Sequence, residues 1–192
     1  LEAMEEGQVT VDGVTHSVPQ PFLVIATQNP AGSSGTQLLP DSQLDRFMVK
    51  LSLGYPSAAD ETELLRRKQS GNPLSQVERA ATLNDLEDMR AAVDRVYLSD
   101  AVCEYIVRLI GATREHPLIV QGASPRATLA VAAMSRAAAF VRGRDYVTPD
   151  DVRLVFADTV SHRLLLSPRG ESGEGGSPVE SILKGVQPPA IQ

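Results

Sequence analysis

The sequence predicts a small α/β unit followed by an all-helical domain. The apolar run Phe22-Leu-Val-Ile-Ala leads into the polar Thr27-Gln-Asn29, which is typical of a buried parallel strand that ends in a polar amide. After Tyr55-Pro56, apolar residues recur at helical spacing instead. We therefore place the boundary between the two units after residue 54.

Residues 1–18 predict the end of a helix and then a hairpin. The segment Leu1-Glu-Ala-Met-Glu-Glu-Gly7 is typical of the last turns of a helix closed by glycine. Residues 8–18 turn at Asp12-Gly13, a dipeptide that accepts the positive φ angles of a two-residue hairpin loop. Two short antiparallel strands are therefore expected before the apolar run.

The rest of the α/β unit, residues 1–54, follows in order. Residues 22–27 are the predicted strand, which brings Asn29 to the sheet edge where α/β proteins bind ligands. A Gly/Ser loop at residues 31–36 precedes a short helical turn that carries Arg46. An alternating strand is expected over residues 47–53.

Capping signals divide residues 55–166 into a series of helices. Ser57 with Asp60 opens the first, whose acidic start and basic end, Arg66-Arg-Lys68, match the helix macrodipole. Later helices are expected to begin at Thr82 with Asp85, at Ser99, at Ser124-Pro125 and at Thr148-Pro149 with Asp151. The helix after Ser99 carries the clearest apolar stripe, made of Val102, Tyr105, Ile106, Leu109 and Ile110. These signals predict a small helical bundle.

The C-terminal segment is expected to be a linker and a tail. Residues 167–178 are rich in Gly, Ser and charge and too poor in apolar side chains to fold alone, which predicts a flexible linker. In residues 179–192, apolar positions recur at helical spacing from Val179 to Val186. That spacing predicts a two-turn amphipathic helix, which must dock on another surface to be stable.

Composition narrows the function classes. The 192 residues are 42% hydrophobic and 22% charged, enough for one good core or two small ones. A formal net charge of −6 argues against a surface built to neutralise phosphates, so we expect no nucleic-acid partner. No run is long enough to span a membrane, and we expect no membrane insertion.

Cysteine and histidine predict neither a disulfide nor a metal site. The single cysteine, Cys103, is in line with Ile106 and Ile110 and is expected to be a core thiol. Because no signal peptide is visible either, we expect a cytoplasmic protein. His16, His116 and His162 lack ligand spacing, which predicts no metal site.

The chain lacks the motifs that hold nucleotide phosphates. A P-loop needs a glycine-rich turn followed by Lys and Ser or Thr, but the only lysines, Lys50, Lys68 and Lys184, do not follow glycine. The pair Asp60-Glu61 follows Pro56-Ser57, not an apolar strand, so it does not match the acidic pair that holds magnesium. We expect this chain alone to have no ATPase activity, and we expect the phosphate-binding half to lie outside it.

The motifs nevertheless resemble those of AAA+ ATPases. The segments Ala26-Thr-Gln-Asn-Pro30 and Leu39-Pro-Asp-Ser-Gln-Leu-Asp-Arg-Phe47, with Gly122-Ala-Ser-Pro-Arg-Ala127, look most like the MoxR family in order and spacing. Leu1–Gly7 is similar to the segment that follows the Walker B strand in that family. The resemblance implies the α/β remnant of a P-loop AAA+ core followed by an all-α helical lid domain.

Three residues carry the expected chemistry. The resemblance makes Asn29 the sensor 1 asparagine, which could orient a water beside a γ-phosphate; Asn before Pro also commonly starts a loop. It makes Arg46 the arginine finger, because guanidinium stays charged and can bond two phosphate oxygens. The alternative for Arg46 is a salt bridge with Asp41 or Asp45.

Arg126 is singled out by local physics as well. A cation in the first turn of a helix opposes the macrodipole unless an anion lies nearby, and a bound phosphate would supply one. By resemblance Arg126 is the sensor 2 arginine, which contacts nucleotide phosphate from the lid. The alternative is a solvated arginine paired with a neighbour one turn away.

The resemblance also implies a function for the intact protein. It would bind ATP and Mg²⁺ at the subunit interfaces of a ring, expected to be a hexamer, and use hydrolysis to remodel partners in a chaperone-like way. Those partners are expected to include proteins with von Willebrand factor A domains. The alternatives are a non-catalytic protein-interaction module and a helicase-like nucleic-acid motor. Residues 8–18, the predicted hairpin, contain no Lys or Arg to support the motor.

Overall fold

The computed structural model describes residues 2–28, 39–69 and 72–190. Its helices are α1 (Glu2–Glu5), α2 (Asp41–Leu44), α3 (Ala58–Gln69), α4 (Leu83–Asp94), α5 (Asp100–Glu115), α6 (Pro125–Val141), α7 (Pro149–Val160), α8 (Pro168–Glu171) and α9 (Pro178–Gly185). Two short 3₁₀ helices, η1 (Pro73–Gln76) and η2 (Ser161–Arg163), lie between them. The strands are β1 (Gln8–Val11), β2 (Val14–Ser17), β3 (Ile119–Gln121) and β4 (Leu165–Leu166).

The N-terminal helix and hairpin are confirmed. Gly7 has a φ of +62° directly after α1, the left-handed conformation that closes a helix. Strands β1 and β2 pair antiparallel with Gln8 opposite Ser17. Asp12 and Gly13 have φ angles of 50° and 78°, so the turn is of the two-residue kind that the sequence predicts.

The two other strands predicted for the α/β unit do not form. Residues 22–27 run extended without pairing, and Leu23 and Ile25 are 81% and 83% exposed. Residues 47–53 are likewise unpaired, with Leu53 97% exposed. A parallel strand is stable only when neighbouring strands satisfy its backbone groups, and within the described residues no strand lies beside either segment. The expected sheet edge is therefore absent from the described part of the chain.

The predicted helix caps are confirmed before α3, α4, α5 and α7, whereas Ser124, before α6, makes no capping hydrogen bond. Ser57 and Asp60 exchange hydrogen bonds before α3, and Thr82 and Asp85 form a capping box before α4. The same box recurs before α7, where Thr148 bonds Asp151. These caps were predictable because both partners lie within one turn of each other in sequence.

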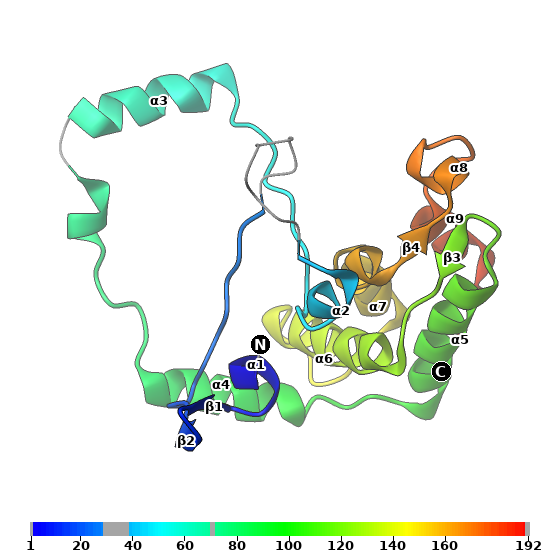
Figure 1. Ribbon diagram of the computed structural model, residues 1–192, viewed down its shortest axis with the longest axis horizontal. Coiled ribbons are helices and arrows are strands. Elements are labelled where there is room, and N and C mark those ends of the chain that lie inside the picture. Colours follow the sequence, from blue (N-terminus) through cyan, green and yellow to red (C-terminus); the bar gives the residue numbers. More distant parts are fainter. Residues whose placement is uncertain (1, 29–38, 70–71, 191–192) are drawn as a thin grey trace.

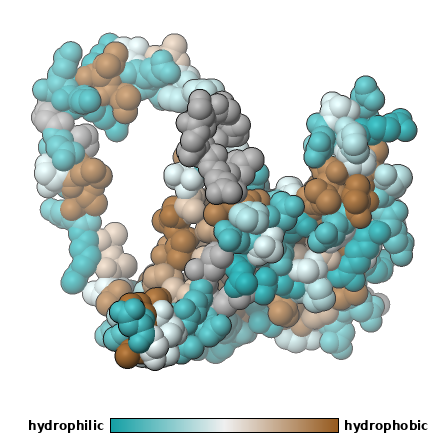
Figure 2. Space-filling model, viewed as in Figure 1, coloured by the Kyte–Doolittle hydropathy of each residue, from teal (hydrophilic) through white to brown (hydrophobic). Residues whose placement is uncertain are grey.

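The buried core lies in the C-terminal part of the chain. It begins at Val96 and includes Tyr105, Ile106 and Leu109 of α5, Val131 of α6, Val152 and Phe156 of α7, and Val179 and Ile182 of α9. Neither α3 nor α4 contains a buried residue. Figure 1 shows α3 standing away from the bundle formed by α5, α6, α7 and α9, and Figure 2 shows apolar side chains exposed along this open part.

The predicted linker and tail pack against the bundle. Residues 167–178 contain α8, in which Gly170 is buried so tightly that a Cβ there would lie 2.7 Å from the carbonyl oxygen of Leu118. The segment is therefore not a free linker, because its backbone, not its apolar side chains, makes the contact. As predicted for the tail helix, α9 docks, burying Val179 and Ile182 against the core that contains α5.

Candidate functional site

The structure places two of the three predicted site residues close together. Asn29 lies outside the described residues. Arg46 follows the short helix α2 and is half-buried, as are its neighbours Leu44 and Phe47. Arg126 stands in the first turn of α6, and its side chain is 47% exposed. The residue next to Arg46 in sequence, Asp45, joins these two segments.

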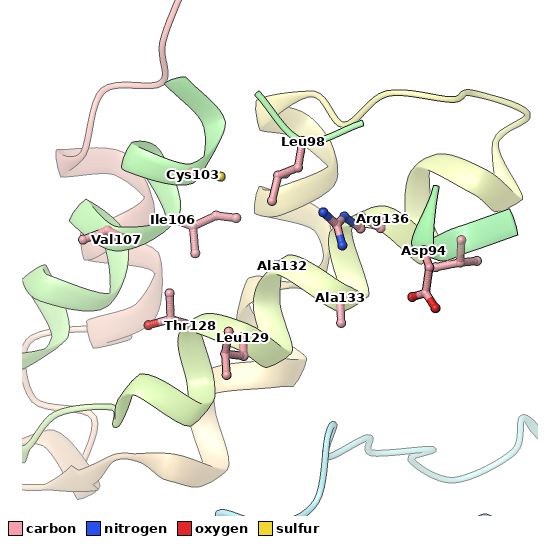
Figure 3. A pocket seen from close by; sticks show the side chains of 11 residues that line it. Asp94, Leu98, Cys103, Ile106, Val107, Thr128, Leu129, Ala132, Ala133 and Arg136 are labelled. Carbon is pink, nitrogen blue, oxygen red and sulfur yellow. The ribbon is translucent and has the colours of Figure 1, made fainter. Parts of the chain in front are cut away.

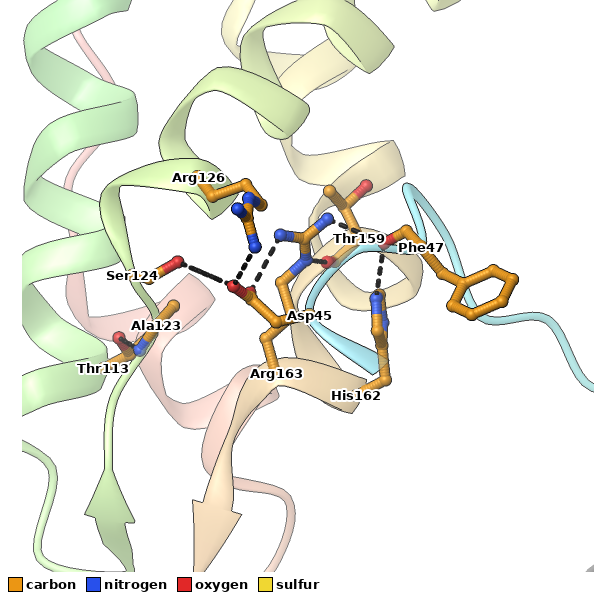
Figure 4. Close-up of polar contacts among 9 residues, drawn as sticks. All are labelled: Asp45, Phe47, Thr113, Ala123, Ser124, Arg126, Thr159, His162 and Arg163. Atoms are coloured by element: carbon orange, nitrogen blue, oxygen red, sulfur yellow. Dashed lines mark hydrogen bonds and ion pairs between the residues drawn. The ribbon is translucent and has the colours of Figure 1, made fainter. Parts of the chain in front are cut away.

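Asp45 is the centre of a polar cluster between α2 and the helical bundle (Figure 4). One of its oxygens accepts a hydrogen bond from Nη1 of Arg126 at 3.2 Å, and the other accepts one from Nη1 of Arg163 at 3.1 Å. The hydroxyl of Ser124 donates to the same carboxylate at 3.3–3.4 Å. Two cations therefore share one carboxylate that is 23% exposed.

The cluster explains how Arg126 is tolerated at its position. Ser124 is the N-cap residue of α6, but its hydroxyl makes no capping bond to the helix and instead donates to Asp45. Asp45 thus supplies the anion that a cation at a helix N-terminus requires. Asp45 pairs with Arg126 at the site where the sequence suggested that a phosphate would bind.

Arg163 is the buried member of the cluster. Its side chain is only 2% exposed, and besides Asp45 it donates to the carbonyl oxygens of Thr159, at 3.0 Å, and Phe47, at 2.7 Å. Burial lowers the pKa of Arg163, and the neighbouring Asp45 carboxylate acts in the opposite direction. A buried guanidinium with these three partners fixes the end of α2 onto the bundle.

His162 adds a second contact to the same carbonyl group. Its Nε2 lies 3.0 Å from the oxygen of Phe47, which can only accept, so Nε2 carries the proton. Nδ1 is buried and has no hydrogen-bond partner among the described residues. Burial lowers the pKa of His162 despite the opposing bond to Phe47, which favours the neutral ring.

Sequence reasoning missed Asp45, Ser124, Arg163 and His162 as members of one site. Asp45 appeared only as an alternative partner for Arg46, and Ser124 only as a helix cap. The contacts join residues 79 to 118 positions apart, which no local pattern encodes. The one available signal was the motif Leu44-Asp-Arg-Phe47, where an acidic residue stands directly before the expected finger.

A separate cavity of about 360 Å³ lies among α4, α5 and α6 (Figure 3). Its lining includes Cys103, Ile106 and Leu129, with Asp94 and Arg136 as charged members. Cys103 is therefore half-buried beside a cavity, not a fully buried core thiol as expected. The cavity does not include any residue of the Asp45 cluster.

The described residues include no candidate for a metal site or a membrane span. They contain no group of three or more His, Cys, Asp or Glu side chains placed to hold a metal ion. None of the helices that the structure describes is both long and apolar enough to cross a bilayer.

Comparison with known proteins gives the family. A model of the AAA lid domain matches residues 111–182, and a model described as "ATPase family associated with various cellular activities" matches residues 1–49. The chain is 39% identical over 176 residues to Chaperone MoxR1 of Mycobacterium tuberculosis, an alignment that covers 87% of this chain and 46% of that protein. The chain belongs to the MoxR-like AAA+ ATPases.

Two further proteins are similar over nearly the whole chain. The uncharacterized protein YeaC of Bacillus subtilis is 40% identical over 191 residues, covering 98% of this chain and 60% of YeaC. The crystal structure of a Cytophaga hutchinsonii protein, provisionally named an ATPase, superposes with a TM-score of 0.89 at 37% identity and covers 98% of this chain and 61% of that one. The chain thus spans about half to 60% of the length of these three proteins. The predicted fold class, a AAA+ core remnant with a helical lid, is confirmed.

Proposed function

We propose that the intact protein hydrolyses ATP at the subunit interfaces of a ring and uses that energy to remodel partner proteins. In this proposal Arg46 is the finger that one subunit extends toward its neighbour's nucleotide, and Asn29 orients the attacking water. ATP and Mg²⁺ would be held mainly by P-loop and acidic motifs that are not in this chain. The ring is proposed to be a hexamer in the cytoplasm, with partners that include von Willebrand factor A domains.

One observation carries the proposal furthest: Asp45, adjacent to Arg46, is bonded to Arg126. The bond holds the first turn of α6 against the end of α2, the segment that carries Arg46. If that segment faces a neighbour's nucleotide, the start of α6 would lie at the same interface. We therefore propose that Arg126 acts together with Arg46, across the interface.

These residues fit a phosphate chemically. Arg126 is half-exposed at the start of the 17-residue helix α6, where the helix macrodipole favours a bound anion. Guanidinium groups can each offer two donors to phosphate oxygens without changing their charge. Bound ATP would supply the phosphoryl group for transfer to water. The arginines would neutralise the negative charge that develops on its oxygens.

The test is mutation of Arg46 in the full-length protein. Arg46→Ala should leave ATP binding nearly unchanged and lower turnover by up to roughly 10³-fold, because a finger acts on transition-state charge. Arg46→Lys should recover little, since ammonium lacks the planar fork. Mixing Arg46→Ala subunits with subunits that lack the P-loop lysine should restore part of the activity. Verified mixed rings that stay inactive would remove the interface role from Arg46.

A further inference from the structure

We infer that Asp45 is a positioning residue that holds Arg126 against the finger segment, residues 41–47, and yields Arg126 to phosphate when nucleotide binds. This inference rests on the proposed function, because it assigns a role within the same interface site. It adds what the family relationship does not provide: how the finger segment and the lid are kept in register. The two arginines that share Asp45 differ in burial: Arg163 is 2% exposed and Arg126 is 47% exposed.

We expect the bond between Asp45 and Arg163 to persist when nucleotide binds. Arg163 is 2% exposed, and removing its carboxylate partner would leave a buried cation with carbonyl groups alone. Because those carbonyl groups belong to Phe47 and Thr159, Arg163 also ties α2 to the end of α7. Asp45 is therefore fixed relative to the bundle whether or not it contacts Arg126.

The bond to Arg126 is the exchangeable one. Arg126 is 47% exposed, so water or an incoming anion can replace the carboxylate at little cost. Phosphate carries more charge than a carboxylate and offers more acceptor oxygens to the same guanidinium. When Arg126 turns to phosphate, Asp45 keeps Arg163 and Ser124, so no buried charge is left without a partner.

Asp45 therefore has two opposing effects on nucleotide. It places Arg126 next to the finger segment, which favours the reaction geometry. Its negative charge also competes with phosphate for Arg126, which weakens binding. Removing the charge should thus strengthen nucleotide binding while slowing turnover. A residue that serves only stability would lower both or neither.

The experiment measures ATP affinity, turnover and thermal midpoint for Asp45→Asn in the full-length protein. We expect ATP to bind about 3- to 10-fold more tightly, the effect of one nearby surface charge. Turnover should fall about 10-fold or more, because the carboxylate that joins the segment carrying Arg46 to Arg163 is lost and that segment is no longer held in register. The control Asp41→Asn removes the same charge from an exposed position on α2 and should change both values less than about twofold.

A second variant, Asp45→Glu, tests the positioning role even if Asp45→Asn does not fold. Asp45→Glu keeps the charge that Arg163 needs but moves it by one methylene group. Its affinity for ATP should stay within about twofold of the wild type while turnover falls about 3-fold or more. Wild-type turnover in Asp45→Glu, or weaker ATP binding in a folded Asp45→Asn protein, would overturn the inference.

Arg46→Ala, measured in parallel, separates the proposed ATPase function from the positioning role of Asp45. If Arg46→Ala keeps wild-type turnover, the proposed function fails, whatever Asp45 does. If Arg46→Ala is impaired and the Asp45 variants behave like the wild type, only the positioning role fails.

Discussion

Two carboxylates of this chain each pair with two arginines, yet their settings are opposite. Asp151 is fully buried, and its partners Arg142, Arg144 and Thr148 all lie within nine residues of it. Asp45 is partly exposed, and its partners lie 79 to 118 residues away. The first cluster closes the turn before one helix, whereas the second joins two separate parts of the molecule.

The two carboxylates differ in whether an external anion could replace one of their arginine contacts. Burial by itself raises the pKa of Asp151, but hydrogen bonds from Arg144 and Thr148 outweigh it and lower the value from 3.8 to about 2. Every acceptor position of that carboxylate is in use, so it offers nothing to a ligand. Asp45 has a half-exposed partner that an external anion can reach.

The largest effect on stability is expected from Asp151→Asn. Breaking this buried cluster should lower the unfolding free energy of the lid by about 3 kcal/mol, since one partner of a buried pair is removed. Hydrogen–deuterium exchange of the α7 peptide would measure the loss in the full-length protein. Asp150→Asn is the matched control, because Asp150 is exposed in the same turn. Equal protection in both variants would show that the cluster contributes no stability.

The same variant has a signed pH dependence. Because the folded pKa of Asp151, about 2, lies below its ordinary 3.8, the carboxylate contributes stability above pH 3.8 and loses it as pH falls toward 2. The shift corresponds to roughly 2 kcal/mol. The difference between wild type and Asp151→Asn should therefore be full at pH 7 and shrink below about pH 4.

The sequence predicted the first cluster in part and the second not at all. The Thr148 and Asp151 box is local, so its spacing alone identifies it. Asp45, Arg126 and Arg163 meet only after α6 and α7 have folded around the core. The strand predicted at residues 22–27 does not form for a related reason. Its apolar pattern is local, but a strand also needs neighbouring strands to satisfy its backbone groups.

A smaller loss is expected from Arg163→Lys, which tests whether the second cluster is anchored as described. Lysine can keep the charge near Asp45 but cannot reach Thr159 and Phe47 at the same time, so at least one buried carbonyl group loses its donor. We expect a loss of about 1–2 kcal/mol, read from hydrogen exchange of the η2 peptide. Arg153→Lys is the control variant. Arg153 donates to the carbonyl oxygen of Leu183, away from the Asp45 cluster.

A second pH-dependent effect is expected at His162, beside the Asp45 cluster. The folded pKa of His162 lies below its ordinary 6.5, so the unfolded chain binds a proton that the folded chain does not. Stability should therefore be lost as pH falls through 6.5, and His162→Gln should remove that part of the loss. The control variant His16→Gln, which changes an exposed residue of the hairpin, should show the same loss of stability as the wild type. Identical pH profiles for wild type and His162→Gln would show that His162 does not titrate as the structure implies.

The smallest effect on stability, and the clearest functional contrast, is expected from the exposed arginine of each cluster. Arg126 and Arg142 are 47% and 45% exposed, so Arg126→Ala and Arg142→Ala should each change the unfolding free energy by less than about 1 kcal/mol. Their effects on nucleotide should differ. Arg142 contacts a saturated carboxylate, and its loss should leave ATP affinity unchanged. Arg126 can exchange Asp45 for phosphate, and its loss should weaken ATP binding at matched stability. Titration of both full-length variants with ATP decides the point: equal affinities would mean that Arg126, like Arg142, serves only the fold.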